Sequence, residues 1–211
     1  MTAVNRIIKI LIYSDVAIVT AFSFYGPIFA IFIANHIRGG GPALAGFAVA
    51  TYWVVRTIVQ LPISHYLDRH DGERDDFWAL VGGSFLFSIV PLLYLFASEP
   101  WHVILFQVIY GIGDSLAVPT YLSIYGRHVD KTREGLEWGL RSVTVGIGAA
   151  IAGAAGGLIA AKFGFKVVFL LTSALSFTGS AILLILRGQM NSRIQGGVTA
   201  KITSPTKEHG Q

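Results

Sequence analysis

The feature that constrains this chain most is a series of long apolar stretches separated by short charged segments. About 20 apolar residues are enough for a helix to cross a bilayer, and a helix satisfies its own backbone hydrogen bonds there. Alternating-polarity segments of strand length are absent from the sequence. The sequence therefore predicts an all-α fold, a bundle of six transmembrane helices: Ile7–Ile33, Ala43–Leu67, Phe77–Ala97, Trp101–Tyr125, Trp138–Ala161 and Val167–Leu186.

Composition supports a membrane protein and excludes several other classes. Charged residues make up 13% of the 211-residue chain, against about 25% in ordinary soluble proteins. The absence of cysteine excludes disulfides and thiolate catalysis, and the six histidines lack metal-ligand spacing. There is no nucleotide-binding motif, and Ser84 lies in an apolar segment without a nearby histidine or aspartate. We therefore expect no cofactor, no metal, no enzymatic activity and no nucleic-acid partner.

The distribution of basic residues predicts the orientation in the membrane. With the amino terminus inside, three basic residues fall in outer loops: Arg38, Lys162 and Lys166. The inner segments hold Arg6, Lys9, Arg69, Arg74, Arg127, Lys131, Arg133, Arg141, Arg187, Arg193, Lys201 and Lys207. The positive-inside rule then places both termini in the cytoplasm, which suits a bacterial cytoplasmic membrane. We expect residues 1–186 to form the transmembrane domain and the polar residues 187–211 to be a disordered cytoplasmic tail.

The charged segment between the second and third stretches carries a family resemblance. It resembles the loop signature of the major facilitator superfamily of transporters, Gly-x-x-x-Asp-Arg-x-Gly-Arg-Arg, through Asp68, Arg69, Gly72 and Arg74. This chain departs from the pattern in three ways. Ser64 stands where the first glycine is usual, Glu73 replaces an arginine, and one extra residue separates Arg69 from Gly72.

The fifth stretch adds a second resemblance. Antiporter members of the superfamily carry the pattern Gly-x8-Gly-x3-Gly-Pro-x2-Gly-Gly there. Ala152 replaces a glycine and Gly153 replaces the proline, whereas the spacing is matched by Gly139, Gly148, Gly156 and Gly157. Glycines on one ridge let helix backbones approach closely in lipid. Gly148, Gly153, Gly156 and Gly157 are therefore candidate packing residues, either between subunits or within one subunit.

The resemblance implies a fold and a function. It covers about Asn5 to Leu186, which corresponds to the amino-terminal half of a usual member, and is most like half-size, six-helix transporters. The six helices could form two inverted three-helix units. The implied function is secondary active transport of a small solute by alternating access, in a homodimer or in a heterodimer with another half-transporter. The alternative is a non-transporting membrane scaffold that kept the fold.

Four polar side chains interrupt the apolar stretches. A charge near the bilayer centre costs about 2.5–3.5 kcal/mol, so Asp15, Arg56 and Asp114 should face protein or a water-filled cavity. Helical rise places Arg56 and Asp114 level with each other, which predicts a charge pair. Gln60 shares a helix face with Arg56. No basic residue can be placed near Asp15, so we expect it to be free to exchange a proton and to couple transport, with Asp114 as its rival.

Two further sets of residues follow from the resemblance. In the family, helices one and four line the central cavity, which makes Tyr13, Tyr25 and Tyr121 candidates for its wall. Gln60, on the second stretch near the depth of Asp15, is a further candidate. The acidic loop meets the start of a helix equivalent to the fifth in the other half. The resemblance thus implies a conformational latch between two copies, formed by Asp68, Arg69, Gly72, Arg74 and Arg141.

Overall fold

The computed structural model describes residues 5–69 and 73–187, and the side chains of 67–69 and 73 lie outside that description. The described part consists of helices and short connections, without a strand. Its elements are α1 (Arg6–Ser23), the 3-10 helix η1 (Gly26–Ile28), α2 (Phe29–His36), α3 (Pro42–Arg69), α4 (Glu73–Ser88), α5 (Val90–Tyr94), α6 (Pro100–His128), α7 (Glu134–Phe163), α8 (Phe165–Leu183) and the 3-10 helix η2 (Leu184–Leu186).

Six spans are long and apolar enough to cross a membrane, which confirms the predicted number. They are Arg6–His36, Pro42–Tyr66, Arg74–Tyr94, Pro100–His128, Glu134–Phe163 and Phe165–Leu186. The fifth span begins four residues before the predicted Trp138. This early start carries Arg141 farther into the bundle than the sequence analysis placed it.

Two spans that were predicted as unbroken helices are interrupted. The first breaks after Ser23, where Pro27 lies in a 3-10 turn, and the third breaks at Ile89, two residues before Pro91. Proline has no backbone N–H to donate and its ring crowds the preceding turn. By contrast, Pro62 and Pro119 lie inside α3 and α6 without ending them.

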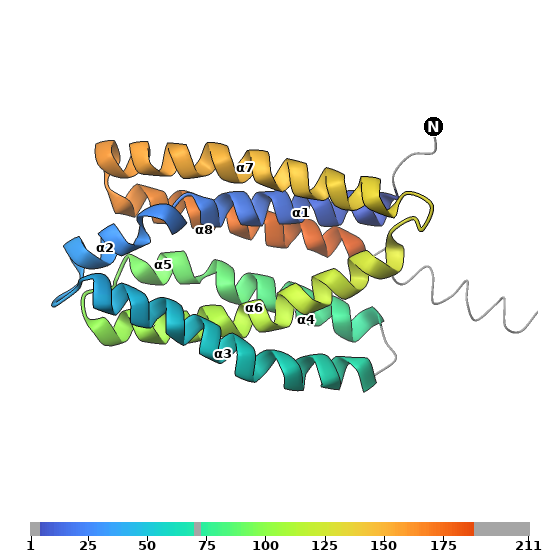
Figure 1. The fold of residues 1–211 in the computed structure, drawn as a ribbon, viewed down its shortest axis with the longest axis horizontal. Helices are drawn as coiled ribbons and strands as arrows, with labels where there is room; N and C mark the ends of the chain where they lie inside the picture. The colour runs from blue at the N-terminus through green and yellow to red at the C-terminus, as the bar shows by residue number, and fades with distance from the viewer. Residues whose placement is uncertain (1–4, 70–72, 188–211) are drawn as a thin grey trace, which may run out of the picture.

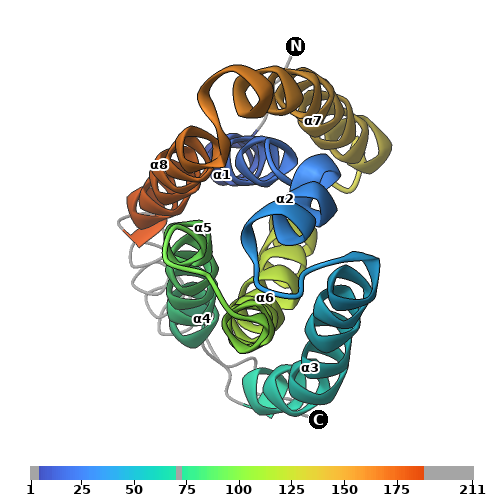
Figure 2. The same ribbon diagram turned by 90° about the vertical axis from the view of Figure 1, so that its left-hand side faces the viewer.

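The spans form one bundle in which α3 and α7 lie at opposite edges (Figures 1 and 2). α3 packs mainly along α6, and α7 packs along α1 and α8. α4 lies between α6 and α8 and contacts both helices in the middle of the bundle. The ends at which α1 and α7 begin lie together on one side, called here the amino-terminal end (Figure 1).

Glycines on α7 let it approach α1 closely within this chain. A Cβ atom at Gly156 would overlap the carbonyl oxygen of Phe24, and one at Gly148 would overlap the hydroxyl of Thr20. At Gly153 a Cβ would lie 3.7 Å from Pro27, whereas at Gly157 it would meet open space. Gly148 and Gly156 therefore pack within one subunit, and Gly157 is free of such contact.

Buried hydroxyl groups connect α8 to its neighbours. Ser14 Oγ donates to the carbonyl oxygen of Gly179 at 2.8 Å, and Ser173 Oγ donates to that of Ser88 at 3.2 Å. The hydroxyls of Ser88 and Ser180 lie 3.2 Å apart. Such side chains hydrogen-bond across helices in lipid, where packing rather than hydrophobicity drives association.

The two ends of the bundle are closed by different contacts. At the amino-terminal end, Arg127 of α6 forms an ion pair with the buried Asp76 of α4. At the opposite end, Gly164 alone joins α7 to α8, with a φ of 82°. Glycine adopts this left-handed conformation without steric cost, which permits so short a connection.

Candidate functional site

A cavity of about 450 Å³ lies between α1, α4, α6, α7 and α8. Three charged side chains line it: Asp15, Asp114 and Arg141. Much of the remaining wall is apolar or aromatic, including Ile18, Phe22, Phe87, Tyr110, Tyr121 and Leu183. A mostly apolar cavity with a few polar groups is typical of a small-molecule site.

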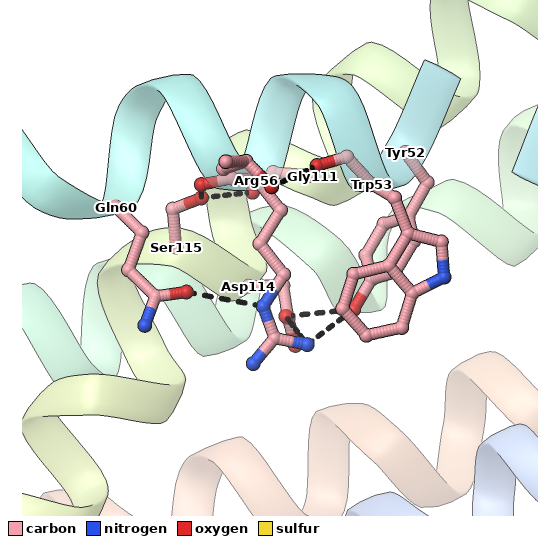
Figure 3. Close-up of polar contacts among 8 residues, drawn as sticks. Tyr52, Trp53, Arg56, Gln60, Gly111, Asp114 and Ser115 are labelled. Carbon is pink, nitrogen blue, oxygen red and sulfur yellow. Dashed lines mark hydrogen bonds and ion pairs between the residues drawn. The ribbon is translucent and has the colours of Figure 1, made fainter. Parts of the chain in front are cut away.

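The first charged cluster joins α3 to α6 and is called here the Arg56 cluster (Figure 3). Arg56 Nη1 lies 3.1 Å from Asp114 Oδ2. The Tyr52 hydroxyl donates to that same oxygen at 2.9 Å and accepts from Arg56 Nη1 at 2.8 Å. Arg56 Nε donates to Gln60 Oε1 at 3.2 Å. The ion pair expected from the sequence is thus present, while its role in transport stays a prediction.

Helix geometry explains how the Arg56 cluster forms. Tyr52, Arg56 and Gln60 are four residues apart, so they lie on one face of α3. α6 comes close because Gly111 has no side chain: a Cβ there would lie 3.1 Å from the carbonyl oxygen of Tyr52. This approach brings Asp114 beneath the guanidinium of Arg56.

The second charged cluster joins α1 to α7 and is called here the Arg141 cluster. Arg141 Nη2 lies 2.9 Å from Asp15 Oδ2, and Arg141 Nε donates to the Tyr121 hydroxyl at 3.2 Å. The guanidinium carbon lies 5.1 Å from the Tyr121 ring centre and 5.9 Å from that of Trp138. Both side chains of the ion pair are largely buried, with 25% exposure for Arg141 and 13% for Asp15.

The expectation that Asp15 has no basic partner is therefore wrong. α7 begins at Glu134, so Arg141 lies seven residues, or about 10 Å, inside the helix. Asp15 lies nine residues, or about 14 Å, from the start of α1 at the same end. The close packing of α7 on α1 then brings the two side chains together.

The two clusters share four residue types: arginine, aspartate, tyrosine and tryptophan. In each, an arginine lies three residues after a tryptophan on one helix, as in Trp53 with Arg56 and Trp138 with Arg141. Arg56 lies over Trp53 with 5.1 Å between the guanidinium carbon and the ring centre. The acid and, in the Arg141 cluster, the tyrosine come from neighbouring helices. The repeated Trp-x-x-Arg spacing is the sequence signal that would have revealed the second cluster.

Three other residues expected at a cavity wall do not line this cavity. Tyr13 is 65% exposed on the surface of the described bundle. Tyr25 is buried in an aromatic cluster, with ring centres 5.6 Å from both Phe29 and Phe169. Gln60 binds Arg56 in the Arg56 cluster, outside the lining of this cavity. Tyr121 does line the cavity, beside Arg141.

The residues of the expected latch are only partly described. Gly72 and the side chains of Asp68 and Arg69 lie outside the described residues, while Arg74 is exposed at the start of α4. Arg141, the fifth member, is engaged with Asp15 within the chain. Across the residues that the structure describes, no group of three or more histidine, aspartate or glutamate side chains could hold a metal ion.

Comparisons with known proteins agree with this architecture. The family model of the Major Facilitator Superfamily matches residues 15–207. Inner membrane transport protein YajR of Escherichia coli is 28% identical over 147 residues, covering 69% of this chain and 31% of that protein. Uncharacterized MFS-type transporter MJ1560 of Methanocaldococcus jannaschii is 25% identical over 146 residues, covering 69% and 36%.

A solved structure shares the fold. The POT family transporter PepTSo superposes with a TM-score of 0.73 at 17% sequence identity, over 88% of this chain and 38% of that one. The chain therefore spans about a third of the length of each of these proteins. At this identity the likeness establishes the fold alone.

Proposed function

The chain belongs to the Major Facilitator Superfamily and is a multi-pass membrane protein, and we propose that it provides six helices of a secondary transporter for a small solute. The observation that carries this proposal is the pair of charged clusters beside one cavity. Each buried charge near the bilayer centre costs about 2.5–3.5 kcal/mol. A scaffold gains little from that cost, whereas a solute path through the membrane needs polar groups at depth.

Transport is the direct test of this proposal. Purified protein in proteoliposomes should take up or release a solute with saturation when a pH gradient is imposed. The rival scaffold predicts neither saturable transport nor saturable solute binding. If solute movement stays at the level of protein-free liposomes for every solute class tried, and no solute binds, the scaffold is favoured.

The edges of the bundle support a second six-helix unit as the partner. α3 exposes large apolar side chains along its length: Phe47, Trp53, Val54, Ile58 and Leu61. α7 does the same with Leu136, Val143, Ile147, Ile151 and Leu158. Lipid covers part of this surface in any arrangement. We assign the rest to a second copy of this chain that completes a cavity with alternating access, a heterodimer being the other possibility.

Subunit stoichiometry in nanodiscs tests this assembly. A two-fold dimer is expected, with Asp68 of one copy near the start of α7 in the other, since a helix amino terminus favours a carboxylate. A cysteine pair at Asp68 and Gly139 should then crosslink between copies. A protein that stays monomeric in bilayers, without crosslinking, would end this part of the proposal.

Proton coupling is assigned to Asp15, with Asp114 as the rival. Both carboxylates line the cavity, where water can deliver a proton. Asp15→Asn should abolish transport driven by a pH gradient while solute exchange continues. Unchanged pH-driven transport in this variant would move the assignment to Asp114, and unchanged transport in both asparagine variants would remove proton coupling from these sites.

Orientation can be tested in the same cysteine-free chain. Single cysteines at Arg38 and Lys162 should react with an impermeant thiol reagent on intact cells, because both are expected outside. A cysteine at the exposed Lys131 should react only after the membrane is permeabilised. The opposite pattern would invert the orientation.

A further inference from the structure

The acid and the arginine of the Arg141 cluster are held in unequal ways. Arg141 is fixed by Tyr121, which accepts from Nε at 3.2 Å, and by the faces of two aromatic rings. Asp15 Oδ2 is buried, and its partner in the described part of the chain is Arg141 alone. The guanidinium would therefore keep its position if Asp15 withdrew from it.

The Arg56 cluster is different in this respect. Asp114 Oδ2 receives a second hydrogen bond, from the Tyr52 hydroxyl at 2.9 Å, and Arg56 is not among the residues lining the cavity. Replacing Asp114 by a ligand would break two interactions, and the ligand would have to reach an arginine beside the cavity rather than in its wall. Arg141 is in the wall and has one exchangeable partner.

Charge balance indicates what can take the place of Asp15. A proton on Asp15 removes its negative charge and leaves the arginine uncompensated at a largely buried position, which is strongly unfavourable. A bound cation would add to that positive charge, whereas a bound anion would cancel it. Arginine also offers several N–H donors in a planar fork that matches a carboxylate, so one guanidinium can hold the anion in a defined orientation.

We propose that Arg141 binds the carboxylate of the transported solute in exchange for Asp15 as that residue takes up a proton, so that the solute is an organic monoanion with an apolar body. The body would lie against Ile18, Phe22, Phe87, Tyr110 and Leu183 in the cavity of about 450 Å³. Solute and proton together carry no net charge. The inference rests on the proposed transport function, because it names the substrate class of the same cavity.

The neighbours of Asp15 let a pH dependence be interpreted. The ionisable side chains that interact with it are Arg141 on α7 and the phenols Tyr121 and Tyr125 on α6. α8 meets α1 at Gly179 and carries one ionisable residue, Lys166, at the other end of the bundle. η2 is apolar. Tyrosine and arginine do not change charge between pH 5 and 8 in their ordinary states, so Asp114 is the other cavity group to control.

Calorimetric binding to the full chain in nanodiscs tests the proposal. The probe is 3-phenylpropionate, compared with 3-phenylpropionamide and 3-phenylpropylamine, which share its apolar body. Titrations in buffers of different ionisation enthalpy count the protons taken up on binding. The wild-type protein should bind the carboxylate with uptake of close to one proton, bind it more tightly as the pH falls, and bind the amide and the amine at least about tenfold more weakly.

Three variants sharpen the result. Asp15→Asn should bind the carboxylate with no proton uptake and no pH dependence, because its side chain is permanently neutral. Arg141→Lys keeps the positive charge beside Asp15 but loses the fork, so affinity should fall at least about tenfold. Arg38→Lys, at an exposed ion pair far from the cavity, is the matched control and should bind like the wild type.

Several outcomes would overturn the inference. These are preferential binding of the amine, binding unaffected by Arg141→Lys, or proton uptake that survives Asp15→Asn and disappears in Asp114→Asn. Lack of saturation at about 10 mM carboxylate would do the same, since a site with a dissociation constant of about 1 mM would be filled there. Failure of the transport proposal can be told apart from failure of this inference. Binding of the carboxylate with uptake of a proton, but without transport into proteoliposomes, would overturn transport and leave the binding assignment standing.

Discussion

The Arg56 cluster and the Arg141 cluster are built from the same residue types but hold their charges differently. In the Arg56 cluster the Tyr52 hydroxyl bonds both the acid and the arginine, so three side chains close on one another. In the Arg141 cluster the Tyr121 hydroxyl bonds the arginine only. A shared set of residues thus produces one internally satisfied ion pair and one whose acid depends on a single partner. The position of one tyrosine hydroxyl is the main difference between the two ion pairs.

The largest expected effect tests this difference directly. Asp114→Asn should lower the free energy of unfolding by about 3–5 kcal/mol, because it strands the buried charge of Arg56. Asp15→Asn should cost less, since Arg141 lines a cavity that can hold water, whereas Arg56 is not part of the cavity wall. Thermal unfolding in detergent measures both.

A double substitution at the Arg56 cluster provides the control. Asp114→Asn with Arg56→Gln removes both charges and should be more stable than the sum of the single losses predicts. An equal loss from Asp15→Asn and Asp114→Asn would show that the two ion pairs do not differ in the way described.

The next effect concerns how α7, the helix that carries Arg141, is held on α1. Gly156→Ala should cost about 1–3 kcal/mol, because the new Cβ would overlap the backbone of Phe24 and force the helices apart. Gly157→Ala is its matched control, since a Cβ there meets open space. Thermal unfolding in detergent should show a lower stability for Gly156→Ala than for Gly157→Ala. Equal stability of the two variants would contradict the close α1–α7 contact.

A smaller effect isolates the tyrosine hydroxyls. Tyr52→Phe removes two hydrogen bonds within its cluster and Tyr121→Phe removes one. Interhelical hydrogen bonds in membranes contribute about 0.6 kcal/mol on average and up to about 1.7 kcal/mol. The loss of unfolding free energy should therefore be near the upper value for Tyr52→Phe and near the lower value for Tyr121→Phe. A larger loss from Tyr121→Phe than from Tyr52→Phe would mean that the two hydrogen bonds of Tyr52 do not stabilise the Arg56 cluster.

The smallest effect concerns the tryptophan under each arginine. Trp53 is 54% exposed, so Trp53→Leu should cost about 0.5–1 kcal/mol through the lost cation–π contact. Trp138 also contacts Tyr125, with ring centres 4.4 Å apart, so Trp138→Leu should cost more. Unfolding midpoints of both variants check this order, with Trp101→Leu at the opposite end of the bundle as a control.

Much of the fold could be predicted from the sequence, because crossing a bilayer imposes a length and a polarity that single residues reveal. The same reasoning placed Arg56 level with Asp114, since both positions could be counted from nearby helix ends. It did not reveal the breaks near Pro27 and Ile89. Pro62 and Pro119 lie inside intact helices, so proline alone does not mark a break.

The Arg141 cluster could not be predicted by counting. Arg141 belongs to a span whose start was placed four residues too late, which left it at the membrane surface. Its partner Asp15 lies on a helix far away in the sequence, and only the packing of Gly148 and Gly156 against α1 brings the two together. Tyr13 and Tyr25 show the complementary limit: the family resemblance placed both at a cavity wall, but the rotation of α1 and its break after Ser23 decide which side chains reach the cavity within this chain.

The single-residue connection at Gly164 has a mechanical consequence. One residue joins α7 to α8 there, whereas residues 129–133 join its other end to α6, so the α8 end is the tighter of the two connections. Arg141 lies 23 residues from Gly164, or about 34 Å at 1.5 Å per residue. A tilt of about 5° would then carry its backbone about 3 Å, roughly the length of its ion pair with Asp15. A small rotation at the α7–α8 connection is therefore enough to make or break this charge contact at the distant part of α7.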